Sequence, residues 1–126
     1  MKLHEQRDTH LNAVTGYGPG YIEINGVRHA GNLLLATASV QRWDVSGFDQ
    51  LGPEDFEPVL QAKPELVLLG TGARHRSVSP RLTAFLARSG VGLEAMDTQA
   101  ACRTFNILAG DGRRVVGAIL QEEDQK

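Results

Sequence analysis

The order of apolar and polar positions predicts alternating short strands and helices. Residues 33–36 and 66–69 are apolar without interruption, which is typical of strands buried on both faces of a sheet. Residues 115–120 are expected to form the last strand, and residues 91–96 another that follows a helical stretch. This pattern indicates an α/β fold.

The stretch between two of these strands has the features of a complete helix. Residues 80–89 carry apolar side chains at a helical spacing, with Ser79 placed as the N-cap and proline at the first position. Gly90 follows as a helix-ending glycine. The spacing of strand, helix and strand predicts a right-handed crossover, so the strands at 66–69 and 91–96 should be parallel.

The last helix is predicted over residues 98–109 and contains the single cysteine of the chain. Asp97 stands just before this helix, where aspartate is a common N-cap. Cys102 and Phe105 lie on the apolar side, and Asn106, four residues after Cys102, shares that face. We therefore expect Cys102 to be buried in the core.

The N-terminal part of the chain is predicted to form a β-hairpin. Asn25-Gly26 separates two short β-prone runs, and this dipeptide favours a two-residue type I′ turn. A cluster of glycine and proline at residues 16–20 is interpreted as a turn that precedes the hairpin.

The segment from residue 40 to residue 61 has less regular patterns. Residues 40–45 alternate apolar and polar positions, which predicts a strand with one exposed face. Trp43 in this strand is expected to pack against the hairpin, and the alternative is a partner-contact anchor, because Trp is common at hot spots. Pro58 interrupts a helical pattern, so we expect a short turn from Pro53 and a separate helical turn from Pro58.

Length, charge and cysteine content limit the classes of protein that fit this chain. A chain of 126 residues and 13.7 kDa is expected to form one domain, with residues 1–15 and 121–126 loosely ordered. The formal net charge of −2 gives no argument for nucleic-acid binding. A polar N-terminus, a lone cysteine and the lack of a membrane-spanning apolar stretch together predict a cytoplasmic protein.

The loop after residues 66–69 is the main candidate binding site. Ligands of α/β sheets usually bind beyond the carboxyl ends of strands, which is where this loop is expected to lie. The predicted binding residues come from this loop, from the helix start after it and from the last helix: Gly70, Thr71, Gly72, Arg74, Arg76, Ser79, Asp97, Thr98 and Asn106.

Two interpretations of Gly70-Thr71-Gly72 remain open from the sequence. Backbone N–H groups at a helix start attract anions, so the loop could hold a phosphate or a similar group. The known phosphate fingerprints are incomplete, because no Gly-Lys-Ser/Thr sequence follows and His75 occupies the place of the third glycine. The other interpretation is a tight structural turn from strand to helix.

Parallel strands would bring the Gly70 loop and Asp97 to the same edge of the sheet. Arg74 could then pair with Asp97 as a structural latch, or face solvent as part of a binding rim for an anion. We expect the latch, with an exposed rim beside it.

No catalytic residue, metal site or cofactor is predicted. Neither a Ser/His/Asp set nor a pair of carboxylates can be assembled from the spacing of the residues. Cys102 could be a nucleophile and Asp97 a general base, but a core position and a helix cap are the simpler interpretations. His4 and His10 are interpreted as solvated.

Two segments of the sequence resemble the Mth-type domain family of unknown function. They are Val-Leu-Leu-Gly-Thr-Gly-Ala-Arg at residues 67–74 and Glu-Ala-Met-Asp-Thr-Gln-Ala-Ala-Cys-Arg-Thr-Phe-Asn-Ile-Leu at residues 94–108. The resemblance extends over residues 21–120 and includes the hairpin and the strand with Trp43. It implies a three-layer α/β fold with a mixed central sheet, flanking helices and an N-terminal β-hairpin layer.

The resemblance also implies binding rather than catalysis. The family contains uncharacterised bacterial proteins, an adipogenesis-associated vertebrate protein and a mitochondrial assembly factor of respiratory complex I, which acts as a binding partner during assembly. A non-enzymatic protein-interaction or assembly-factor-like domain with an unidentified protein partner is the leading hypothesis. The alternative is a small-molecule or anion-binding enzyme that uses residues 70–76 and the Asp97 region. The lack of a transit peptide suits a bacterial cytosolic protein.

Overall fold

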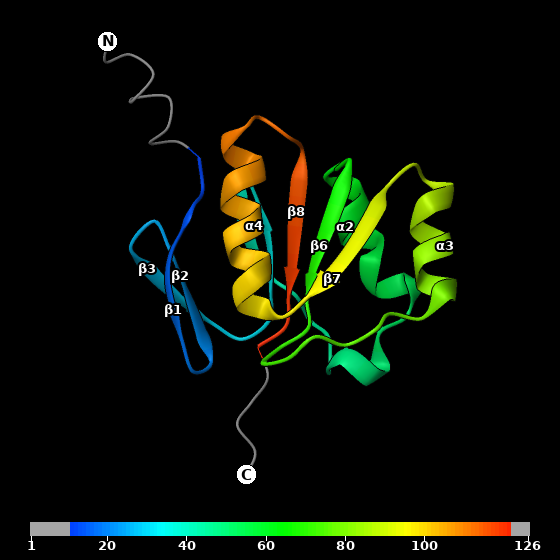
Figure 1. Ribbon diagram of the computed structural model, residues 1–126, viewed down its shortest axis with the longest axis horizontal. Helices are drawn as coiled ribbons and strands as arrows, with labels where there is room; N and C mark the ends of the chain where they lie inside the picture. Colours follow the sequence, from blue (N-terminus) through cyan, green and yellow to red (C-terminus); the bar gives the residue numbers. More distant parts are fainter. Residues whose placement is uncertain (1–10, 122–126) are drawn as a thin grey trace.

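The structure is a computed structural model that describes residues 11–121, in which two β-sheets pack with helices (Figure 1). The elements in chain order are β1 (Val14–Gly18), β2 (Tyr21–Ile24), β3 (Val27–Ala30), β4 (Leu33–Ala36), β5 (Ser39–Arg42), the 3₁₀ turns η1 (Phe48–Gln50) and η2 (Pro53–Phe56), α2 (Glu57–Gln61), β6 (Leu66–Gly70), α3 (Pro80–Arg88), β7 (Gly92–Met96), α4 (Thr98–Gly110) and β8 (Val115–Ile119).

The larger sheet is mixed, as the family resemblance implies. Its strand order is β5-β4-β8-β6-β7, with β6 parallel to both β7 and β8 and with β4 antiparallel to β8 and β5. Val67, Leu68 and Leu69 in β6 are fully buried, because this strand has neighbours on both sides and helices over both faces. The uninterrupted apolar run therefore predicted a central parallel strand correctly.

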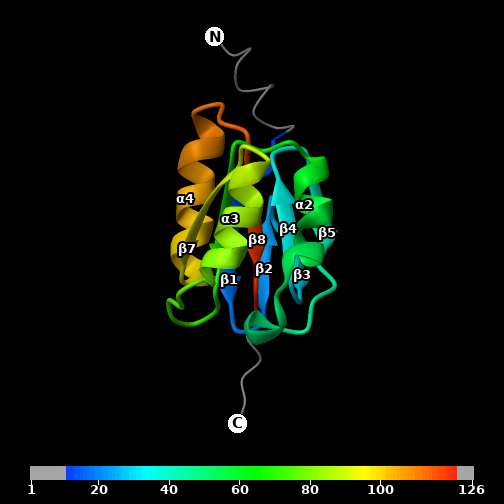
Figure 2. The same cartoon turned by 90° about the vertical axis from the view of Figure 1, so that its right-hand side faces the viewer.

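Each face of the larger sheet has its own apolar core. Helix α4 and the three-stranded sheet β1-β2-β3 cover one face, while α2, α3 and η2 cover the other (Figure 2). The buried side chains of α4 share one stripe of the helix: Ala101, Cys102, Phe105 and Ala109. Burial of such side chains contributes roughly 1.5–3 kcal/mol for each large one, so α4 is held mainly by this stripe.

The smaller sheet corrects two predictions for the N-terminal region. Val14–Gly18 forms β1, which pairs with β2, so only Pro19 and Gly20 remain for the turn predicted at residues 16–20. Val14 and Thr15, predicted to be loosely ordered, belong to this strand. Glycine fits at residue 18 because the Tyr21 ring lies over it, and an added Cβ would be 2.5 Å from the ring.

The hairpin of β2 and β3 is confirmed at the predicted turn. Asn25 and Gly26 have φ values of 52° and 85°, which is the conformation that a type I′ turn requires. Pro53 begins η2, as expected, whereas α2 begins at Glu57, one residue before the predicted start at Pro58. His4 and His10 lie outside the described residues.

Trp43 packs in the core, but its neighbour is not the predicted hairpin. The strand expected at residues 40–45 ends at Arg42, and the indole ring of Trp43 meets the Phe56 ring edge-on with centroids 5.5 Å apart. The indole N–H donates to the carbonyl of Asp55 at 3.0 Å, and only 3% of Trp43 is exposed. Trp43 therefore joins β5 to η2 and is too buried to serve as an exposed partner anchor.

Candidate functional site

The loops that follow β6 and β7 lie side by side at one edge of the larger sheet, as the topology predicts. The Thr71 N–H donates to the carbonyl of Met96 at 2.9 Å, and the Thr98 N–H donates to the carbonyl of Gly72 at 2.8 Å. Two backbone bonds thus join the Gly-Thr-Gly loop to the end of β7 and the start of α4. We call Gly70, Thr71, Gly72 and Thr98 the edge junction.

The Thr98 hydroxyl connects three segments of the edge junction. It accepts a hydrogen bond from the Gly72 N–H at 2.9 Å and donates to the carbonyl of Leu120 at 2.8 Å. Gly70 allows this close approach, because an added Cβ there would lie 3.0 Å from Thr98 Oγ1 and 3.2 Å from Thr98 Cα. Gly72 is needed for another reason: its φ of 102° is in the left-handed region.

Thr71 is a buried polar residue whose hydrogen bonds stay within the fold. It is 1% exposed, and its hydroxyl donates to the carbonyl of Arg74 at 2.6 Å. Since Thr71 and Gly72 both use their N–H groups inside the edge junction, these groups are not available to hold a phosphate. The geometry thus agrees with the interpretation of Gly-Thr-Gly as a structural turn.

The predicted latch between Arg74 and Asp97 is not formed. Asp97 Oδ1 accepts a hydrogen bond from the Ala100 N–H at 2.9 Å, so this carboxylate serves as the N-cap of α4. Arg74 is exposed, and its side chain has no ion pair or hydrogen bond with any residue between 11 and 121. Because the Asp97 carboxylate already accepts a hydrogen bond at the start of α4, it does not form the predicted pair with Arg74.

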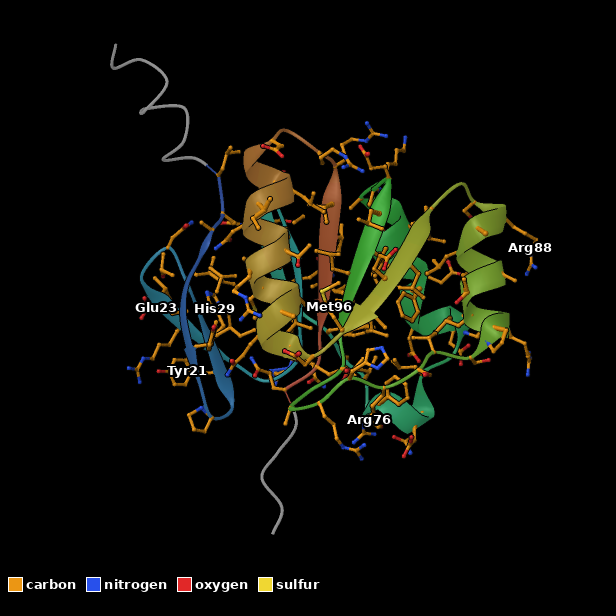
Figure 3. The ribbon with its side chains drawn as sticks, viewed as in Figure 1. Tyr21, Glu23, His29, Arg76, Arg88 and Met96 are labelled. Atoms are coloured by element: carbon orange, nitrogen blue, oxygen red, sulfur yellow. The ribbon has the colours of Figure 1, made fainter. Side chains whose placement is uncertain are left out.

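The remaining predicted site residues lie in two other places. Arg76 faces η1, where its guanidinium is 3.9 Å from the Asp49 carboxylate and 5.4 Å from the Phe48 ring centre (Figure 3). Ser79 caps α3 through a bond from the Arg81 N–H to its hydroxyl at 3.2 Å.

Asn106 is the predicted site residue that lies farthest along α4, and it holds β1. Its side-chain amide accepts from the Val14 N–H at 2.8 Å and donates to the Val14 carbonyl at 2.9 Å. Asn106 therefore acts as a clamp between α4 and the smaller sheet, and the structure does not bring it to the edge junction.

An open pocket of about 300 Å³ lies beside the edge junction. Its lining comes from the β1–β2 turn, the Gly72 loop, the start of α4 and the end of β8: Tyr17, Gly18, Pro19, Gly20, Tyr21, Ile22, Gly72, Ala73, Thr98, Gln99, Leu120 and Gln121. We call it the tyrosine pocket. Gly72 and Thr98 are predicted site residues, but the pocket as a whole could not be predicted, because β1 is not recognisable in the sequence and the four segments meet only in the folded chain.

The chemistry of the tyrosine pocket suits recognition better than acid–base catalysis. Apart from two tyrosines, the described residues that line it carry no titratable side chain. The Gln121 side-chain NH₂ is buried and has no hydrogen-bond partner within residues 11–121. The pocket therefore offers aromatic surface from Tyr17 and Tyr21, while the buried Gln121 NH₂ is not exposed to it.

Cys102 is a core residue, as predicted. It is 1% exposed, and burial raises the pKa of its thiol to about 11, an effect that the nearby Arg103 charge partly opposes. A thiol with a raised pKa is a poor nucleophile at neutral pH. Among residues 11–121, no cluster of three or more His, Cys, Asp or Glu side chains could bind a metal ion. None of the helices in this range has the length and apolar character needed to cross a membrane.

Known proteins resemble the chain over most of its length. Residues 14–120 match the family described as "Protein of unknown function (DUF498/DUF598)". An uncharacterised protein of Rhodobacter capsulatus is 36% identical over 107 residues, covering 85% of this chain and 82% of that protein. NADH dehydrogenase (ubiquinone) 1 alpha subcomplex assembly factor 3 of Bos taurus is 33% identical over 109 residues; the match covers 85% of this chain and 59% of that protein.

A solved structure is similar to this chain in both sequence and fold. The solution NMR structure of a Mth938-like domain from Bordetella pertussis is 37% identical, with a TM-score of 0.82, and the match covers 99% of this chain and 95% of that one. The family match, the relatives and the shared fold agree with one another. The chain belongs to the Mth938-like family of unknown function, DUF498/DUF598.

Proposed function

We propose that this chain is a non-enzymatic protein-binding domain that assists the assembly of a multi-subunit complex in the cytoplasm. The observation that carries the proposal is its similarity, over most of its length, to proteins named as assembly factors of NADH dehydrogenase. The chain spans less than two thirds of those proteins, so the proposal concerns a binding role and not their whole activity.

The geometry around the edge junction supports binding over catalysis. The polar groups of the Gly-Thr-Gly loop are used to join β6, β8 and α4, and Cys102 is buried. The adjoining tyrosine pocket presents Tyr17, which is 37% exposed, and tyrosine is enriched at protein interfaces.

Affinity capture from native lysate tests this function. The tagged chain is crosslinked in its own cells, and the captured proteins are identified by mass spectrometry. We expect the subunits of one complex to be enriched over a tag-only control. Absence of any enriched protein would contradict the binding function.

Two matched variants locate the contact. Gln99→Arg places a bulky charge at the tyrosine pocket, while Gln61→Arg makes the same change on α2, where the glutamine is also exposed and does not line this pocket. We expect Gln99→Arg to lose the captured subunits and Gln61→Arg to retain them. Equal capture by both variants would move the contact away from the tyrosine pocket.

A further inference from the structure

A second pocket, of about 270 Å³, opens at the opposite edge of the larger sheet. It lies at the amino ends of β6 and β8, whereas the edge junction lies at their carboxyl ends. Its lining is mainly aliphatic and small: Leu11, Ala36, Thr37, Ala62, Pro64, Ala109, Gly112, Arg113, Arg114, Val115 and Val116. We call it the arginine pocket. Its volume is near the lower end for ligand sites, which suits one or two side chains better than a cofactor.

One wall of the arginine pocket is fixed by hydrogen bonds from Asn12. Asn12 donates from its side chain to the carbonyls of Ala36 and Ser39, at 2.9 and 3.1 Å, and from its backbone to Thr37. These bonds hold the neighbouring Leu11 at the rim, where 40% of that side chain is exposed. An aliphatic surface is thus kept open to solvent.

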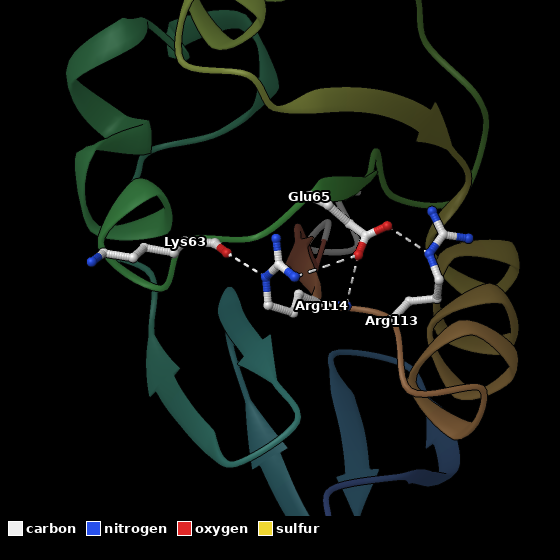
Figure 4. A network of polar contacts seen from close by, with 4 residues as sticks. All are labelled: Lys63, Glu65, Arg113 and Arg114. Atoms are coloured by element: carbon white, nitrogen blue, oxygen red, sulfur yellow. Dashed lines mark hydrogen bonds and ion pairs between the residues drawn. The ribbon is translucent and has the colours of Figure 1, made fainter.

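The charged side chains of the rim are held in place by a network around Glu65 (Figure 4). Arg113 Nε donates to the Glu65 carboxylate at 2.7 Å, and Arg114 Nε donates to the carbonyl of Lys63 at 3.1 Å. The Arg113 bond is the main reason that the pKa of Glu65 is lowered, so this carboxylate stays ionised at neutral pH. Lys63 has a φ of 52°, a conformation uncommon for a residue other than glycine.

The charge balance of this rim is opposite to that of the whole chain. Arg113 and Arg114 give two positive charges against one negative charge on Glu65, while the chain has a formal net charge of −2. The Arg114 side chain is 70% exposed and that of Arg113 46% exposed. Arg113 uses its Nε within the network, and Arg114 uses its Nε and one terminal nitrogen, which is 4.0 Å from the Glu65 carboxylate. The remaining terminal nitrogens can still face a ligand.

We propose that the arginine pocket binds an acidic peptide segment of a protein partner, with an aliphatic side chain seated between Leu11 and Ala62 and neighbouring carboxylates paired with Arg113 and Arg114. The aliphatic lining selects the anchor, and arginine forks match carboxylates in geometry as well as in charge. The inference rests on the proposed protein-binding function and adds the chemistry of the partner. It uses a surface separate from the tyrosine pocket.

Calorimetric titration with defined peptides tests the proposal. The probe is a short unlabelled peptide in which two leucines flank two glutamates; the control peptides replace the glutamates by lysines or the leucines by alanines. We expect a heat of binding for the leucine–glutamate peptide and none for either control peptide. The affinity should fall as salt is raised from about 0.05 M to about 0.5 M, because exposed charges are screened over shorter distances.

Variants of the intact chain separate charge from shape. Arg113→Gln with Arg114→Gln should weaken binding roughly tenfold or more, because two charge-assisted contacts are lost. The control is Arg103→Gln, an exposed arginine of α4 that does not line the pocket. Ala62→Leu should block the anchor site, and Ala87→Leu on the exposed side of α3 should not. Melting temperatures show that each variant is folded.

Several outcomes would overturn the proposal. Three results with the peptides would do so: the lysine peptide binds as tightly as the acidic peptide, the acidic peptide still binds the Ala62→Leu variant, or the acidic peptide does not bind at all. Decanoate serves as a further probe, and its binding without binding of any peptide would also overturn the proposal. If the acidic peptide fails while affinity capture from lysate still succeeds, the arginine pocket is excluded and the protein-binding function stands. If capture fails as well, the proposed function fails independently.

Discussion

At Gly70 an added Cβ would lie 3.0 Å from Thr98 Oγ1 and 3.2 Å from Thr98 Cα, which is tighter than an ordinary contact. We predict that Gly70→Ala lowers the free energy of unfolding by about 1–3 kcal/mol, because the new Cβ would press on Thr98 backbone and hydroxyl atoms in a packed region. Gly110→Ala is the matched control: it lies in α4 with nothing within 4 Å of an added Cβ. Urea unfolding curves of both variants check this, and equal midpoints would contradict the close-approach argument.

The thiol of Cys102 should make stability depend on alkaline pH. Its pKa is raised in the folded chain from 9.0 to about 11, so the unfolded chain loses its proton first. The stabilising contribution is complete below pH 9 and declines between about pH 9 and 11, by at most about 2–3 kcal/mol in total. Free energies of unfolding measured by urea at pH 8 and at pH 10.5, about the end of that range, check the prediction.

The control for this pH dependence is Cys102→Ala, whose stability is lower at every pH but lacks the decline assigned to the thiol. In the same preparation, thiol reagents should label native Cys102 slowly at neutral pH, since the side chain is 1% exposed. Fast stoichiometric labelling without denaturant would contradict the burial of the thiol.

The role of a residue could be predicted from the sequence where that role depends on its neighbours in the chain. Ser79 and Asp97 stand next to helix starts, and both cap the helices that follow them. The role of Asn106 could not be predicted, because its partner Val14 is 92 residues away. The latch between Arg74 and Asp97 failed for a related reason, since parallel strands bring loops to one edge without deciding which side chains meet.

At the scale of single elements, the two N-cap residues differ in solvent exposure: Asp97 is half-buried and Ser79 is exposed. We predict that Asp97→Ala lowers the free energy of unfolding by about 0.5–2 kcal/mol, since the Ala100 N–H loses its acceptor. The Ser79 cap is exposed and its bond is longer, at 3.2 Å, so Ser79→Ala should cost less. Denaturation midpoints of the two variants check the order. An unchanged midpoint for Asp97→Ala would remove its capping role and reopen a functional one.

Periodicity was sufficient for β4, β6, β7 and β8 of the larger sheet, placed β5 too far along the chain, and was insufficient for β1. An apolar run identifies β6 because both of its faces are buried, whatever lies around it. In β1, Gly16 and Gly18 suggest a turn by composition, yet they pair with Glu23 and Tyr21 in a ladder whose register shifts between Val14 and Gly16. The close approach of the Tyr21 ring favours glycine there, and no local pattern indicates that contact.

At the scale of the whole molecule, the two pockets belong to opposite edges of one sheet. The tyrosine pocket lies at the carboxyl ends of β6 and β8, and the arginine pocket at their amino ends. Each is lined by segments that are far apart in the sequence, so the motifs indicated Gly72 and Thr98 of the tyrosine pocket but not the rest of either lining. A protein with two separated recognition surfaces can contact two partners, or two regions of one partner, and this is consistent with an assembly role.

Asn106 adds hydrogen bonds to the apolar contacts that attach the smaller sheet to α4, and this gives a prediction for the whole fold. Asn106 satisfies both the N–H and the carbonyl of Val14 at the start of β1. We predict that Asn106→Ala lowers the free energy of unfolding by about 1–3 kcal/mol, because these part-buried backbone groups lose their partners. Hydrogen exchange should rise first in β1 and β2, while the amides of β6 stay protected.

The control is Arg103→Ala, which shortens an exposed side chain of the same helix and leaves the Val14 contacts intact. Because the β1–β2 turn forms one side of the tyrosine pocket, Asn106→Ala should also weaken any partner that binds there, although Asn106 does not line that pocket. Peptide binding at the arginine pocket should change less, since its walls come from the larger sheet, α2 and the end of α4 together with Leu11. Uniform exchange across both sheets would show that they unfold as a single unit and that Asn106 is not the point of attachment.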